Sequence, residues 1–259
     1  MKKSIIIPMM LIAGLALASF ASGITLKLRP QKDKTYVINS TSNQKTVMKI
    51  QGQSMTSTQK LDIRQTFVAK EVTEQSSTIE TQIEAIKLNG NSMGMAFAYD
   101  SENPQGSSPL IAQQTKAYED FLKKPVTMTF NELGINNNPD DNNLNQLRNA
   151  IIELPDKELS VGSQWTFVKT NTVGDYDYNV NITCTVTGVS KKSIDFSFIG
   201  EINSKDVTGN FNGTSSINPN TGIIITTTTE NTVSVTISEQ GMEIPMTITG
   251  TTTVNVKEN

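Results

Sequence analysis

Residues 232–256 read TVSVTISEQGMEIPMTITGTTTVNV, and this stretch decides the fold class. Val233, Val235 and Ile237 alternate with Thr or Ser, and the apolar residues beyond the turn at 239–241 alternate in the same way. A period of two places apolar and polar side chains on opposite faces of a β-strand. The stretch therefore predicts a hairpin of two long antiparallel strands, each with one apolar and one polar face.

The same alternation fills two long parts of the chain, residues 24–100 and 161–257, which we call the two β-runs. In the first run Leu61, Ile63 and Phe67 share one parity, and in the second Ile182 and Cys184 do. Threonine is frequent because its branched Cβ suits a pleated strand. The pattern leaves open whether the two runs form one sheet or two packed halves.

The stretch between the runs, residues 109–154, has a different pattern. Apolar residues at helical spacing predict two short helices, one over 110–122 and one over 141–152, ended by Pro125 and Pro155. We therefore expect a single mainly β domain over residues 22–259. Its long antiparallel strands would form a curled, incompletely closed barrel-like sheet, with a central insertion of two short helices.

The N-terminus is typical of a secretory signal peptide, residues 1–21. Lys2 and Lys3 precede an apolar run to Leu17, and Ser19-Phe20-Ala21 supplies the small residues of a cleavage site. The run is shorter than the ~20 residues of a membrane-spanning helix. Cys184 lies far from this site, so no cysteine there can carry a lipid. We expect an exported protein, periplasmic or extracellular, that is not lipid-anchored.

Composition excludes several classes of function. A net charge of -3 without a basic excess argues against a nucleic-acid partner. The chain has no histidine and one cysteine, which excludes histidine-dependent and cysteine-dependent catalysis. Residues 137–143 are rich in Asn and Asp but lack the spacing of a calcium loop. We therefore expect no enzyme activity, no cofactor and no metal site.

Three short motifs carry a resemblance to a known family. They are Tyr99-Asp100-Ser101-Glu102-Asn103-Pro104, Leu154-Pro155 and Val161-Gly162-Ser163-Gln164-Trp165. Together they resemble an uncharacterised family of exported envelope proteins of Bacteroidetes-type bacteria, a domain of unknown function, and Gln164 departs from its pattern. No functional residue carries over from that family. More distantly, the β–helix–β layout is similar to periplasmic lipoprotein carriers, which are unclosed β-barrels with a helical lid over an apolar cavity.

That layout motivates the leading functional hypothesis, a non-enzymatic exported protein that binds a lipid or other apolar ligand. The apolar face of the predicted helices would cover the ligand with Leu110, Ile111, Phe121, Leu122, Leu147 and Ile151. One alternative is a structural module of the envelope that binds another protein and no small ligand, through an exposed sheet edge or loop. A third is a hydrolase that uses Asp175 and Asp177 as paired carboxylates. The oligomeric state stays open.

Overall fold

The computed structural model describes residues 23–50, 52–92, 94–103, 122–137, 150–173, 176–204, 207–239 and 242–259. The predicted signal peptide lies outside these residues, so export stays a prediction. Four residues of the predicted lid also lie outside them, namely Leu110, Ile111, Phe121 and Leu147.

The described residues are organised as β-strands, several of them long. In chain order they are β1 (Ile24–Thr25), β2 (Thr35–Ile50), β3 (Gln53–Val72), β4 (Ser76–Ser92), β5 (Met95–Asp100), β6 (Val126–Asn131), β7 (Glu158–Leu159), β8 (Gln164–Val173), β9 (Tyr176–Val189), β10 (Ile194–Asn203), β11 (Val207–Ile217), β12 (Ile224–Glu239) and β13 (Met242–Glu258). β3 alone has 20 residues, against ~5–6 in an ordinary strand.

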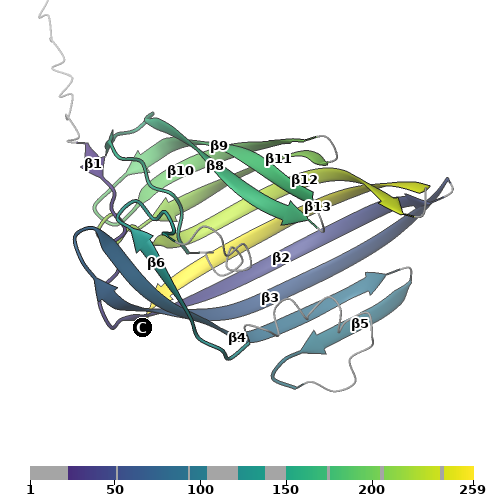
Figure 1. The fold of residues 1–259 in the computed structure, drawn as a ribbon, viewed down its shortest axis with the longest axis horizontal. Coiled ribbons are helices and arrows are strands. Elements are labelled where there is room, and N and C mark those ends of the chain that lie inside the picture. Colours follow the sequence, from purple (N-terminus) through teal and green to yellow (C-terminus); the bar gives the residue numbers. More distant parts are fainter. Residues whose placement is uncertain are drawn as a thin grey trace, which may run out of the picture.

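All but β1 and β7 of the described strands belong to one antiparallel sheet (Figure 1). Its order is β5-β4-β3-β2-β13-β12-β11-β10-β9-β8, and β6 pairs with β4 beyond the stretch that β5 occupies. The last strand, β13, pairs with the first long strand, β2, from Met246 opposite Met48 to Glu258 opposite Tyr36. The two β-runs are therefore halves of one sheet, and in the described residues that sheet is not closed.

Side-chain alternation gives this sheet two chemically different faces. On the inner face, Tyr36 and Ile38 of β2 lie opposite Phe67 and Gln65 of β3, and all four are buried. The outer face of the same strands carries mostly threonine, asparagine and charged residues. The sheet curls, as Figure 1 shows, so that the inner faces of β8 and β13 line one cavity.

Irregular segments close one end of the curled sheet. Leu26 and Leu28 are fully buried there. The Leu28 N–H donates to the Glu132 carbonyl at 2.7 Å, and the Arg29 N–H donates to the Thr221 carbonyl at 2.8 Å. These bonds tie the end of β6 to the turn between β11 and β12. The N-terminal segment thus joins parts of the sheet that no strand pairing connects.

The predicted pair of central helices is not found: no helix occurs in the described part of the chain, and residues 110–121 and 141–149 lie outside it. Of the second predicted helix, Ala150 is in a turn and residues 151–152 are irregular, as are residues 153–155 beyond it. The backbone groups at this end bond to other segments instead. The Ala150 carbonyl accepts from the Ile224 N–H at 3.1 Å, and the Leu154 N–H donates to the Leu133 carbonyl at 2.8 Å.

The end of the first predicted helix is also not helical. Leu122 forms an isolated parallel bridge with Ile83 of β4. The next residue, Lys123, has a φ of 55° and donates its N–H to the Ile83 carbonyl at 2.8 Å. Helical spacing of apolar residues therefore did not distinguish a helix from an extended segment that packs along a sheet.

Pro245 marks where β13 changes from one neighbour to two. It lies opposite Thr236 of β12, but the pairing with β2 starts only at Met246. Proline has no N–H for a ladder hydrogen bond, so strands tolerate it where one side has no partner. Thr247, two residues further, lies between Ser234 on β12 and Val47 on β2.

We predict that Thr247→Pro lowers the free energy of unfolding by about 3 kcal/mol or more. The Thr247 N–H faces either β12 or β2, and both strands pair with β13 at this residue. A proline has no N–H, so the sheet loses a hydrogen bond in either case. Urea denaturation followed by circular dichroism measures the change. Thr247→Ala is the matched control and should cost less than about 1 kcal/mol. Equal effects of the two substitutions would contradict the central position of β13.

Candidate functional site

A cavity of about 240 Å³ lies between the inner face of β8–β13 and the irregular segment 151–153. Its wall is mainly apolar and is dominated by side chains from four neighbouring strands, Phe167, Ile182, Phe196, Phe198 and Phe211. Cavities that enclose drug-sized ligands usually have ~300–1,000 Å³. The smaller volume here suits a slender apolar chain better than a bulky ring system.

Glycines create the room for two of these phenylalanines. On the β10–β11 pair, Phe198 lies opposite Gly213 and Phe211 lies opposite Gly200. A Cβ at either glycine would collide with the facing ring, so each ring covers bare backbone. The rings of Phe198 and Phe211 are 6.1 Å apart and inclined by 57°, an edge-to-face arrangement. These pairs fix the rings that line the cavity.

Hydroxyl groups line the opposite end of the cavity, on β11, β12 and β13. The Ser215 hydroxyl donates to the Thr226 carbonyl at 3.1 Å and lies 2.7 Å from the Thr227 hydroxyl. Thr229 and Thr252 also line the cavity. The cavity therefore has an aromatic side and a hydroxyl side, which suits a ligand with two chemically different ends.

Cys184 lies in the cavity wall and is buried. Burial raises the pKa of its thiol to about 12, because the thiolate would lose its hydration. The thiol is therefore protonated at physiological pH and is a poor nucleophile. Its role is that of a small apolar wall residue, as its strand parity with Ile182 predicts.

Two residues of the predicted lid fall in the described part of the chain. Ile151 lines the cavity, from an irregular segment. Leu122 packs against the main core and is not part of the cavity wall. Asp175 lies outside the described residues, so the carboxylate pair that it would form with Asp177 stays a prediction.

Sequence reasoning missed the phenylalanine wall. Its signal is present: Phe196, Phe198 and Phe211 alternate with polar residues on strands that also carry inward-facing glycines. Reading that signal requires the register between β10 and β11, which places Phe198 opposite Gly213 and Phe211 opposite Gly200.

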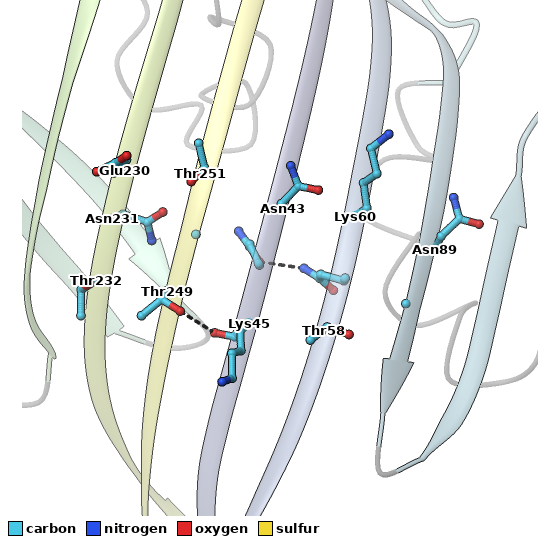
Figure 2. A pocket seen from close by; sticks show the side chains of 14 residues that line it. Asn43, Lys45, Thr58, Lys60, Asn89, Glu230, Asn231, Thr232, Thr249 and Thr251 are labelled. Atoms are coloured by element: carbon cyan, nitrogen blue, oxygen red, sulfur yellow. Dashed lines mark hydrogen bonds between the residues drawn. The ribbon is translucent and has the colours of Figure 1, made fainter.

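A second, larger hollow of about 690 Å³ lies on the outer face, across β12, β13, β2, β3 and β4 (Figure 2). Two rows of polar side chains border it, and residues within each row are cross-strand neighbours. One row is Glu230, Thr251, Asn43, Lys60 and Asn89, and the other is Thr232, Thr249, Lys45 and Thr58. The side chains around this hollow are polar, whereas the wall of the inner cavity is mainly apolar.

Ion pairs lie beside the outer hollow. Lys60 lies 3.0 Å from Asp62, which also accepts a hydrogen bond of 2.6 Å from the Thr41 hydroxyl. Partial burial raises the pKa of Asp62, but these two donors outweigh it and the pKa is lowered. Lys87 pairs with Asp100 at 3.0 Å, and its hydrogen bond lowers the pKa of Asp100. Charges thus compensate one another on this face.

Two features are absent from the described residues. No helix among them is long and apolar enough to cross a membrane. No group of three or more Cys, Asp or Glu side chains in that part of the chain could hold a metal ion.

No family model matches the chain, and no curated protein is similar to it in sequence. Membership of the exported envelope family therefore stays a prediction. Among solved structures, a lipovitellin structure titled for its lipid–protein interactions is similar, with a TM-score of 0.50 and 12% identity. The match covers 88% of this chain and 25% of lipovitellin, so this chain spans about a quarter of that protein. At this identity the likeness shows the fold alone.

We predict that Cys184 resists alkylation by iodoacetamide in the folded protein at pH 9 and reacts quickly in urea. Unfolding returns the thiol to its ordinary pKa of ~8.5, where the reactive thiolate is abundant. The pKa of the thiol is higher in the folded protein than in the unfolded one. The free energy of unfolding therefore keeps its full value below pH ~8.5 and falls as the pH rises toward 12. Mass spectrometry of alkylated protein measures the rates, and rapid labelling of folded protein would contradict the burial.

Two buried inner-face serines provide a matched pair for a stability test. The Ser40 hydroxyl has no hydrogen-bond partner in the described structure, whereas the Ser215 hydroxyl has two. We predict that Ser215→Ala costs about 1 kcal/mol and that Ser40→Ala is neutral or stabilising. Urea denaturation of both variants measures the difference. A larger loss for Ser40→Ala would show that its hydroxyl has a partner.

Proposed function

We propose that this is an exported, non-enzymatic protein that binds a lipid or other apolar ligand in the inner cavity. The observation that carries the proposal is the cavity itself, whose wall contains four phenylalanines, two of them placed opposite glycines on an adjacent strand. The fold also supports a lipid as the ligand, because the similar lipovitellin structure is titled for lipid–protein interactions.

The wall favours an apolar ligand for a physical reason. Transfer of apolar surface from water into the cavity is favourable by ~25 cal/mol per Å² buried. The Phe196 ring lies 5.1 Å from the Trp165 ring and 6.3 Å from the Phe198 ring, both in tilted contacts, so the rings are held by one another before a ligand arrives. A preformed wall lowers the entropic cost of binding.

Two of the polar groups in the cavity wall do not oppose this binding. Ser215 and Thr227 satisfy each other, so an apolar chain beside them leaves neither hydroxyl without a partner. Export is supported by the sequence of residues 1–21, with its basic start, apolar run and small residues at Ser19 and Ala21.

We predict that Thr229→Phe reduces the amount of bound ligand at least about tenfold, because a ring at 229 fills a small cavity. Thr229 lies on the cavity wall. The protein would be purified from a bacterial periplasm and examined by native mass spectrometry before and after solvent extraction. Its mass would also report whether the chain has been cleaved after Ala21.

Thr228→Phe is the matched control, because residue 228 is exposed and its side chain lies on the outer face. That variant should keep the bound mass of the unaltered protein. Absence of any bound mass, together with no binding of added lauric acid or monolaurin, would overturn the proposal. The envelope interaction module would then be the better function, and a pull-down for protein partners would follow.

A further inference from the structure

On β2, β3 and β10 to β13, long stretches of the inner face carry no charged residue. No inner-face position is Asp, Glu, Lys or Arg in six stretches of these strands. The stretches are Tyr36 to Ile50, Met55 to Phe67, Ile194 to Ile202, Val207 to Ile217, Thr227 to Ile237 and Ile244 to Val256. The charged residues of the same strands, such as Lys45, Lys60 and Glu230, occupy outer-face positions. Within these stretches, the sequence thus places charged residues on the outer face alone.

Uncharged polar groups nevertheless gather on the inner face beside the cavity. Two adjacent cross-strand rows contain them, and we call Ser42, Gln44, Gln59, Thr229, Asn231 and Thr252 the inner polar stripe. Within it, the Thr252 hydroxyl donates to the Ser42 hydroxyl at 3.0 Å, and the Gln59 amide donates to the Gln44 carbonyl at 2.7 Å.

The stripe keeps unused hydrogen-bonding capacity. No described residue forms a hydrogen bond with the side chain of Thr229 or of Asn231. The Gln44 amide N–H groups and the Gln59 carbonyl are also unused by the bond between those residues. Polar side chains on a concave apolar face usually have partners, so these groups suit a ligand that supplies them.

The stripe is continuous with the cavity. Thr229 and Thr252 belong to both, and Asn231 lies directly opposite the cavity residue Phe211 in the β11–β12 register. A ligand whose apolar part lies against Phe198 and Phe211 would therefore place its polar end on the stripe.

We infer that the ligand is an amphiphile with an uncharged headgroup that bears hydroxyl or amide groups, such as a monoacylglycerol. This inference rests on the proposed function and names its ligand class. Its tail occupies the phenylalanine wall, and its headgroup exchanges hydrogen bonds with Thr229 and Asn231.

An anionic headgroup fits this surface poorly. A charge taken out of water needs an opposite charge nearby, and the inner-face positions around the stripe supply none. A neutral headgroup does not meet this penalty.

The test is displacement of a fluorescent apolar probe by three ligands with the same chain length: monolaurin, lauric acid and dodecane. We expect monolaurin to bind at least about tenfold more tightly than laurate, because only its headgroup is both neutral and hydrogen-bonding. Laurate binding as tightly as monolaurin would overturn the inference and leave the proposed function standing. Failure of all three to bind would overturn the proposed function as well.

A substitution locates the headgroup. Thr229→Val keeps the shape of the side chain and removes its hydroxyl, which has no described partner in the protein, so folding should be unaffected. We expect monolaurin to bind about three- to tenfold more weakly, the effect of one hydrogen bond, and dodecane to be unaffected. Thr228→Val on the outer face should change neither ligand. Equal weakening of monolaurin and dodecane by Thr229→Val would place the headgroup elsewhere and overturn the assignment.

Discussion

The pairing of β13 with β2 is the interaction on which the rest of the structure depends. It joins the last strand of the chain to the first long one, in an unbroken antiparallel register from Met246 to Glu258. Without it, the two β-runs would be separate sheets with unpaired edges, which are a liability in solution. With it, the inner faces of both runs become one concave surface. The polar stripe spans the strands on either side of this junction, and the cavity ends at β13.

Strict alternation of side chains makes the concave face of the sheet chemically different from the outer face. Because a strand turns successive side chains to opposite faces, a slip of one residue would exchange the two faces entirely. The register places Phe211 opposite Gly200 and Asn231 opposite Gly250, so rings and amides cover glycine backbone instead of meeting side chains. The same register sends Lys45 and Glu230 outward. One structural rule thus gives an apolar, neutral interior and a hydrated exterior.

The wall of the cavity combines rigidity with small size. Trp165, Phe196, Phe198 and Phe211 form a chain of tilted ring contacts from β8 to β11. The Trp165 N–H is satisfied by the Glu153 carbonyl at 3.3 Å, so the polar end of the chain also has a partner. Segment 151–153 is thereby held against β8 and covers the cavity from the open side. Pre-organisation of this kind favours a ligand of defined shape.

The sequence by itself determined the long antiparallel strands and the turns between many of them, because period-two alternation and turn residues are local properties. It also determined which side chains share a face, including the placement of Cys184 and Ile182 on one wall. It did not determine the irregular path of residues 150–155. Apolar residues at helical spacing fit equally well to a segment whose carbonyl and N–H groups bond to Ile224 and Leu133. The joining of β13 to β2, the glycine–phenylalanine pairs and the cavity were decided only by the tertiary structure. Each depends on which residues of distant strands become neighbours, and cross-strand register is set by the packing of the whole sheet.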